Sequence, residues 1–151
     1  MTVNLDFSIL DNTWNTFLPN FKKIITNASK QVFEELNQFQ EKDYEISILL
    51  SNNKYIKELN SNYRFKNKAT NVLSFPMIDS KSLDHENILG DIVISINKIL
   101  SESKEQDIEV NKYLSKITIH GILHLLGYDH ITDDDYLTMS HLEEKIINKK
   151  I

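Results

Sequence analysis

A broad apolar pattern of helical period covers residues 109–126, EVNKYLSKITIHGILHLL, and GYDH follows at once as residues 127–130. The apolar positions span too wide an arc for a helix that lies half in solvent, so the pattern predicts a largely buried helix. Gly127 stands where a residue of left-handed conformation commonly ends a helix. We therefore expect this helix to lie in the core, and the chain to turn back directly after it.

Three histidines stand near the end of this stretch, at His120, His124 and His130. The first two are four residues apart, so on a helix they project from the same face, one turn apart. A turn at Gly127 would then allow His130 to approach them. Three imidazoles without thiolates suit a catalytic zinc ion that keeps a fourth position open for water.

Histidines in an apolar helix can also be core residues or ligands of a different metal. A hydrogen-bonded core role accounts well for one buried histidine, but poorly for three at this spacing. Histidine also binds nickel, copper or iron, and a structural zinc site is disfavoured because such sites usually have four protein ligands. His85 and His141 lie outside the pattern and are expected to be surface or capping residues.

Gly121 follows the first histidine, at the position where a zinc protease of the HExxH pattern carries its catalytic glutamate. That glutamate passes a proton to the leaving amine, whereas phosphodiester cleavage mainly requires stabilisation of negative charge. The glycine therefore favours a phosphodiesterase over a peptidase. Inside a helix it costs about 1 kcal/mol relative to alanine, and either close packing of another segment or room for a substrate would explain it.

Five basic residues and one glutamate lie within residues 52–70, NNKYIKELNSNYRFKNKAT, which gives this segment a charge of +4. Since the net charge of the whole chain is −5, the other residues together carry −9. On charge alone, a solvated helix and loop explains the segment better than a binding surface does. The segment nevertheless holds Arg64, the one arginine among 17 basic residues. Arginine binds phosphate through two parallel hydrogen bonds that lysine cannot copy. A phosphate-binding role is therefore favoured over a buried salt bridge or chance.

Periodicity elsewhere predicts a modest number of strands and helices. Strands are expected at residues 3–8, 45–51, 71–75 and 88–96, with a polar loop at 77–87. Helices are expected within 13–40, divided near Pro19, and at 53–63, 97–105, 109–126 and 133–148. Strands come early and helices late, which predicts an α+β fold: a small mixed sheet packed with several helices, with the metal site at the end of the central buried helix.

Length and composition narrow the remaining possibilities. With 151 residues, the chain is expected to form one domain over residues 1–151. It has no cysteine, so a metal must be held by nitrogen or oxygen. The first residues do not resemble a signal peptide and no apolar run is long enough for a membrane span. We therefore expect a cytoplasmic protein without a membrane partner.

The helix that is expected to begin near Asp133 starts with a run of three acids, Asp133, Asp134 and Asp135, directly after Thr132. Threonine is a common N-cap, and acids in the first turn complement the helix dipole. A capped helix start is preferred to a second metal site.

Two motifs together resemble a known family. The stretch HGILHLLGYDH, residues 120–130, closely resembles the signature of the YbeY family of metal-dependent endoribonucleases, the bacterial rRNA maturation factors. The stretch LNSNYRFKNKATNVLSFP, residues 59–76, resembles the arginine-bearing signature of that family, and LGDIVIS, residues 89–95, has the matching spacing. The resemblance is specific over residues 56–131, about half of the chain.

The resemblance implies an α+β fold, one zinc ion held by His120, His124 and His130, and a catalytic role for Arg64. It also implies single-strand-specific RNA cleavage, maturation of small-subunit rRNA, ribosome quality control, and contact with small-subunit components. One position departs from the family pattern, because Asn71 stands where an aspartate is usual. A zinc peptidase of metzincin-like geometry and a non-catalytic ribosome-assembly factor with a structural metal stay open as alternatives, and the oligomeric state is open as well.

Overall fold

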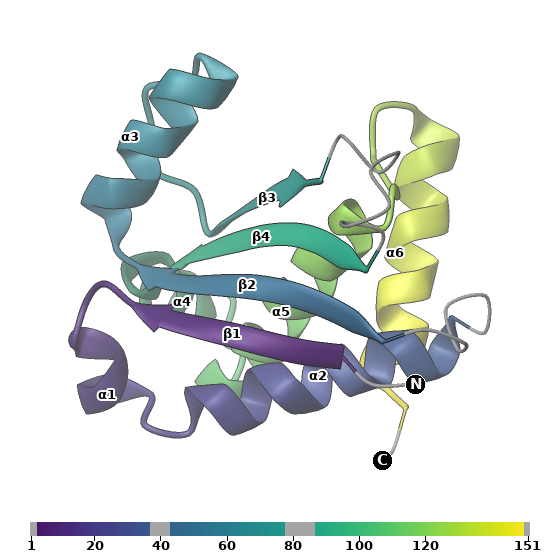
Figure 1. Cartoon of the computed structure of the whole chain (residues 1–151), viewed down its shortest axis with the longest axis horizontal. Coiled ribbons are helices and arrows are strands. Elements are labelled where there is room, and N and C mark those ends of the chain that lie inside the picture. The colour runs from purple at the N-terminus through teal and green to yellow at the C-terminus, as the bar shows by residue number, and fades with distance from the viewer. Residues whose placement is uncertain (1–2, 37–42, 78–86, 150–151) are drawn as a thin grey trace.

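The computed structural model describes residues 3–36, 43–77 and 87–149, and arranges them as a sheet with helices packed on it (Figure 1). The strands are β1 Val3–Ile9, β2 Tyr44–Ser51, β3 Val72–Pro76 and β4 Ile88–Ser95. The helices are α1 Thr13–Phe17, α2 Phe21–Glu35, α3 Asn53–Arg64, α4 Ile96–Glu105, α5 Val110–Leu125 and α6 Asp133–Ile147.

The four described strands form one sheet in the order β1-β2-β4-β3. β1 and β2 run parallel, as do β2 and β4, whereas β3 runs antiparallel to β4 at the edge. The sheet is therefore mixed, and the predicted α+β class is confirmed. The order itself could not be read from the sequence, because periodicity does not say which strand a given strand pairs with.

The main core lies between one face of this sheet and the helices α2, α4, α5 and α6. On β2, alternate residues point into it: Ile46, Ile48 and Leu50 are all buried, as a strand with one buried face requires. α3 packs on the opposite face, where Ile56 meets Val93 of β4 and its neighbours. Helices of the main core thus cover one side of the sheet, and α3 covers part of the other.

α5 is the central helix of the main core, as its apolar pattern predicted. Its buried residues are Tyr113, Leu114, Ile117, Thr118, Ile119, Gly121, Ile122, Leu123 and Leu125. In Figure 1 it lies behind the sheet, between α2 and α6. Burial of these side chains fixes the direction in which the end of α5 presents its histidines.

Several predicted boundaries shift by a few residues. β3 continues through Pro76 instead of stopping before it. Proline is tolerated here because β3 is an edge strand, where the missing N–H can lie on the side that has no neighbouring strand. α4 begins at Ile96, one residue early, because the Ser95 side chain caps it by accepting a hydrogen bond from the Lys98 amide. α2 ends at Glu35, before the predicted end at residue 40, and residues 37–40 lie outside the described residues.

No helix within residues 3–36, 43–77 and 87–149 is long and apolar enough to cross a membrane. Most of the predicted polar loop at 77–87 also lies outside the described residues, and so does His85.

Candidate metal centre

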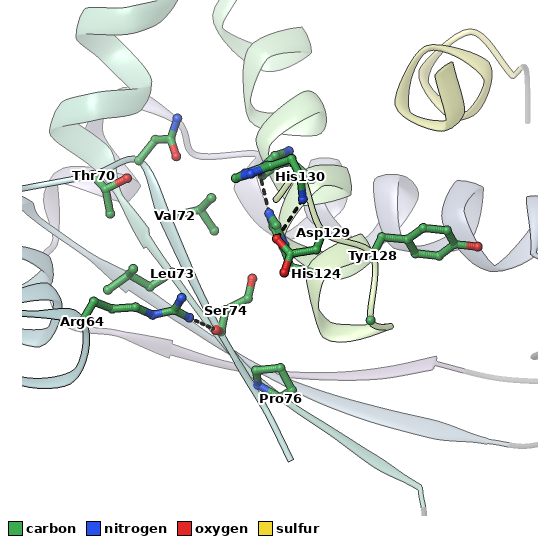
Figure 2. Close-up of a pocket in the computed structure, with 13 residues that line it drawn as sticks. Arg64, Thr70, Val72, Leu73, Ser74, Pro76, His124, Tyr128, Asp129 and His130 are labelled. Carbon is green, nitrogen blue, oxygen red and sulfur yellow. Dashed lines mark hydrogen bonds between the residues drawn. The ribbon is translucent and has the colours of Figure 1, made fainter. Parts of the chain in front are cut away.

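The C-terminal end of α5 brings the three predicted histidines together. His120 and His124 lie one turn apart, and the chain reverses at Gly127, whose φ of +98° confirms the predicted left-handed end. The Gly127 amide donates to the carbonyl of His124, and the Tyr128 amide donates to that of Leu123. This closed turn carries His130 back to the other two imidazoles: its ring centre lies 5.8 Å from that of His120 and 5.0 Å from that of His124. Figure 2 shows His130 beside His124.

The spacing of the three rings has the scale of a single ion. One nitrogen from each ring lies within 4.8 Å of the other two, and the Nε2 atoms of His120 and His124 are 3.1 Å apart. Nitrogens bound to a tetrahedral zinc at about 2.05 Å would be about 3.3 Å apart. His120 and His124 are half-buried and His130 is exposed. The cluster could therefore hold a metal ion with one side closed by protein and the other open.

Burial also keeps one of these imidazoles in the form that binds metal. The pKa of His124 is lowered, first by its desolvation and then by the charges of His120 and His130. A lower pKa favours the neutral ring, whose free nitrogen lone pair can coordinate an ion.

A carboxylate from α6, which the histidine pattern did not predict, holds the first histidine. Glu143 Oε1 lies 2.7 Å from His120 Nδ1, and the Glu143 side chain is only 19% exposed. An ionised carboxylate can only accept a hydrogen bond, so a neutral His120 ring would carry its proton on Nδ1 and leave Nε2 unprotonated, on the side that faces His124. The sequence does carry one signal: Glu143 falls four residues after Met139 and three before Ile146, both buried, so an acid stands on the apolar face of α6.

Arg64 lines the same cavity as the histidines. It ends α3 and borders a cavity of about 480 Å³ together with His120, His124 and His130. Its Nη2 donates to the carbonyl of Ser74 at 2.8 Å, and its guanidinium carbon lies 5.8 Å from the centre of the Phe75 ring. Arg64 is exposed, so the alternative of a buried salt bridge is wrong. The guanidinium has five N–H donors, and donors therefore remain for a ligand.

Ser74 of β3 connects the arginine to the histidine helix. Its carbonyl accepts from Arg64, and its hydroxyl donates to the carbonyl of Gly121 at 2.8 Å. In Figure 2, Ser74 lies between Arg64 and the histidines. Since Ser74 is buried, this path holds α3, β3 and α5 in a fixed relation. No sequence pattern indicates this role, because a serine in a strand has many possible partners.

Comparison with known sequences decides the family. The family model described as Endoribonuclease YbeY matches residues 9–150. The chain belongs to the YbeY family. Endoribonuclease YbeY of Caldicellulosiruptor bescii is 44% identical over 132 residues, which cover 82% of this chain and 80% of that protein. Endoribonuclease YbeY of Ehrlichia canis is 36% identical over 145 residues, which cover 96% of this chain and 92% of that protein.

A solved structure has a similar fold. The solution structure of TM1509 from Thermotoga maritima has a TM-score of 0.58 to this YbeY family member, at 25% sequence identity. The match covers 96% of this chain and 86% of that one. The agreement extends over nearly all of the sheet and helices, and it supports the α+β class independently of the motifs.

Gly121 in this YbeY family member is explained by close packing. A Cβ built on Gly121 would lie 3.1 Å from Val72 Cγ2, 3.3 Å from Ser74 Oγ and 3.5 Å from Ile92 Cδ1. These contacts come from β3 and β4, so the glycine lets α5 approach the sheet. Of the two reasons for a glycine that the sequence left open, close approach of another segment is confirmed, and room for a substrate is not needed.

Asn71, the departure from the YbeY pattern, has a local partner. Its amide Nδ2 donates to Glu102 Oε1 at 3.0 Å, and the Tyr113 hydroxyl donates to the same oxygen at 2.6 Å. Burial, followed by the hydrogen bond and charge of Glu102, raises the pKa of Tyr113 to about 12. An aspartate at position 71 would place a second carboxylate against Glu102. The amide therefore matches its surroundings in this chain.

The remaining predicted residues also have clear positions. Thr132 Oγ1 accepts from the Asp135 amide at 3.0 Å, which confirms the predicted cap with the three acids in the first turn of α6. His141 is exposed on α6 and is not part of the ligand cluster found among the described residues.

Proposed function

We propose that this chain is a metal-dependent endoribonuclease whose ion, zinc, is held by His120, His124 and His130. The observation that carries the proposal is the single cavity that these histidines share with Arg64. Membership of a family described as endoribonucleases supports RNA as the substrate. Zinc in this position would act as a Lewis acid on a phosphoryl oxygen or lower the pKa of a coordinated water.

Arg64 binds the scissile phosphate in this proposal. Its guanidinium is held by the carbonyl of Ser74 and by the face of Phe75, so its orientation is set before a ligand arrives. Preorganised donors of this kind stabilise the charge that develops on phosphoryl oxygens. Glu143 fixes the tautomer of His120 and so keeps Nε2 available for the ion.

Among the residues that the structure describes, the two carboxylates near the histidines, Glu143 and Asp129, fit phosphodiester cleavage better than peptide cleavage. Glu143 is engaged by His120, and Asp129 accepts the backbone amide of His130 at 2.8 Å. Neither stands free beside the ion in the way that the glutamate of a zinc peptidase does. This arrangement supports a reaction that relies on charge stabilisation instead of protonation of a leaving amine.

We extend the proposal to the biological setting that the resemblance to the family implies. We place the activity in the cytoplasm, on single-stranded parts of small-subunit rRNA precursors and in ribosome quality control, in contact with small-subunit components. Residues 1–151 would form one YbeY domain that carries the whole activity. The +4 segment at residues 52–70, which includes α3 and Arg64, supports an approach of RNA from that side.

One preparation can test this function. The purified chain is assayed for bound metal and then for cleavage of an unstructured RNA and a matched duplex, before and after chelation and after zinc is returned. We expect cleavage of the unstructured RNA alone, its loss with chelator and its recovery with zinc. RNA cleavage that is indifferent to chelator would contradict the proposal. Metal-dependent peptide cleavage with intact RNA would point to a peptidase, and rRNA maturation in cells by a metal-free His124→Ala variant would point to an assembly factor.

A further inference from the structure

Phe65 directly follows Arg64, which lines the cavity, and its own position is unusual. It is 92% exposed, the highest value among the exposed large hydrophobic side chains of the described residues. It also caps α3 in the left-handed conformation, with φ 56° and ψ 30°. That conformation is strained for a residue with a Cβ and free of strain for glycine. Neither core packing nor backbone conformation therefore explains a phenylalanine at this position.

The backbone beneath Phe65 is held in place. The amides of Phe65 and Lys66 both donate to the carbonyl of Asn60. The Asn60 side chain, which is 3% exposed, donates from Nδ2 to the carbonyl of Lys68 at 2.9 Å. A buried asparagine thus fixes both ends of the short loop. The aromatic ring is presented from a fixed backbone, which lowers the entropy lost when it binds a ligand.

The residues that flank Phe65 along the chain are mostly cationic and exposed. Arg64 directly precedes it and lines the cavity with the histidines, and Lys66 and Lys68 follow as exposed residues. An aromatic ring among cations suits single-stranded nucleic acid, whose bases stack while its phosphates pair with the charges. Tyr63 differs, because its ring packs edge-on against Phe75 at 5.8 Å and lines a cavity on the other face of the sheet.

We infer that Phe65 is a positioning residue, on which an unpaired base of the RNA stacks beside the phosphate that Arg64 binds. The inference rests on the proposed function and adds a reason for single-strand preference. Because Arg64 and Phe65 are consecutive, a strand whose phosphate meets the guanidinium brings a neighbouring base to the ring. A base inside a duplex is already stacked and paired, so it cannot use this surface.

Two substitutions separate stacking from structure. Phe65→Gly removes the ring and relieves the left-handed strain, so its melting temperature should equal or exceed that of the wild type. Phe65→Trp keeps a stacking surface. With zinc-loaded protein and a short unstructured RNA, we expect Phe65→Gly to lower kcat/KM about 5- to 150-fold, mainly through a higher KM. Phe65→Trp should stay within a few-fold of the wild type.

Abasic sites placed one at a time along the RNA show whether a base is the partner. One abasic position should weaken the wild type by the same factor, and it should have no further effect on Phe65→Gly. Phe65→Trp also gives a binding signal that needs no turnover: Trp14 is fully buried, so quenching on RNA addition reports the new indole. This signal tests the inference even if the wild type cleaves no RNA. Absence of cleavage would contradict the proposed function but not the stacking of a base on Phe65.

Any one of the following results would overturn the inference. The first is a Phe65→Gly variant with wild-type kcat/KM on unstructured RNA. The second is an abasic scan without a sensitive position, or a Phe65→Trp indole that RNA does not quench. The third is a Phe65→Gly variant that handles RNA normally in vitro but loses rRNA maturation in cells, which would assign the ring to a protein partner.

Discussion

The hydrogen bond between Glu143 and His120 leads to a prediction about metal affinity. Glu143→Ala removes the carboxylate that lies 2.7 Å from His120 Nδ1. His120 then loses the partner that fixes its tautomer and orientation. In a fraction of the molecules the ring must therefore rotate or change tautomer before Nε2 can bind the ion. Loss of such a supporting carboxylate typically weakens metal binding about 10- to 100-fold, which corresponds to about 1.4 to 2.8 kcal/mol.

The assay is a competition titration of zinc against a chromophoric chelator at neutral pH. Glu143→Gln should lose less zinc affinity than Glu143→Ala, because its amide oxygen can still accept a hydrogen bond from Nδ1–H of His120. This bond is weaker than that of the wild type because the amide is uncharged. Glu144→Ala is the matched control: it removes an exposed acid one residue further along α6. A zinc Kd for Glu143→Ala equal to that of Glu144→Ala would refute the reasoning, since general loss of negative charge would then account for any effect.

Three further substitutions test other parts of the structure by urea unfolding. Asn71→Asp should destabilise the fold by about 1 to 3 kcal/mol, because it replaces the donor to Glu102 with a second acceptor. Adding Glu102→Gln should restore most of the lost stability. An Asn71→Asp variant as stable as the wild type would contradict the role given to the Asn71–Glu102 hydrogen bond. Tyr113→Phe should cost about 1 kcal/mol. Because the pKa of Tyr113 is raised to about 12 from 10, its contribution to the free energy of unfolding is full below pH 10 and is lost as pH rises toward 12. If the wild type and Tyr113→Phe lost the same stability between pH 10 and pH 12, this reasoning would be contradicted. Gly127→Ala meets no atom within 4 Å, so it should cost only the strain of a positive φ, about 1 to 2 kcal/mol, and a neutral result would mean that the turn relaxes.

The features that the sequence predicted well are those carried by local patterns. Helical period identified α5, the spacing of four placed His120 and His124 on one face, and Gly127 marked the reversal that returns His130. Each of these depends on residues a few positions apart, where backbone geometry alone decides the relation.

The features that the sequence did not predict depend on contacts between distant segments. Glu143 reaches His120 from the next helix, and Ser74 reaches Gly121 from an edge strand. Nothing in the spacing along the chain states that α6 packs on α5 or that β3 lies beside it. The sequence could not decide between close packing and substrate room at Gly121, because that also depends on which strands lie against α5. For the same reason it could not show that Pro76 lies in an edge strand.

The central claim is that the histidine cluster and Arg64 serve one reaction in one cavity. The most direct test is single-turnover cleavage of unstructured RNA by zinc-loaded Arg64→Lys, with zinc affinity and melting temperature measured on the same preparation. Lysine keeps the charge but not the planar fork that pairs with phosphate. We predict unchanged zinc binding and folding, with cleavage slowed about 100-fold or more. Wild-type cleavage by this variant would contradict the claim.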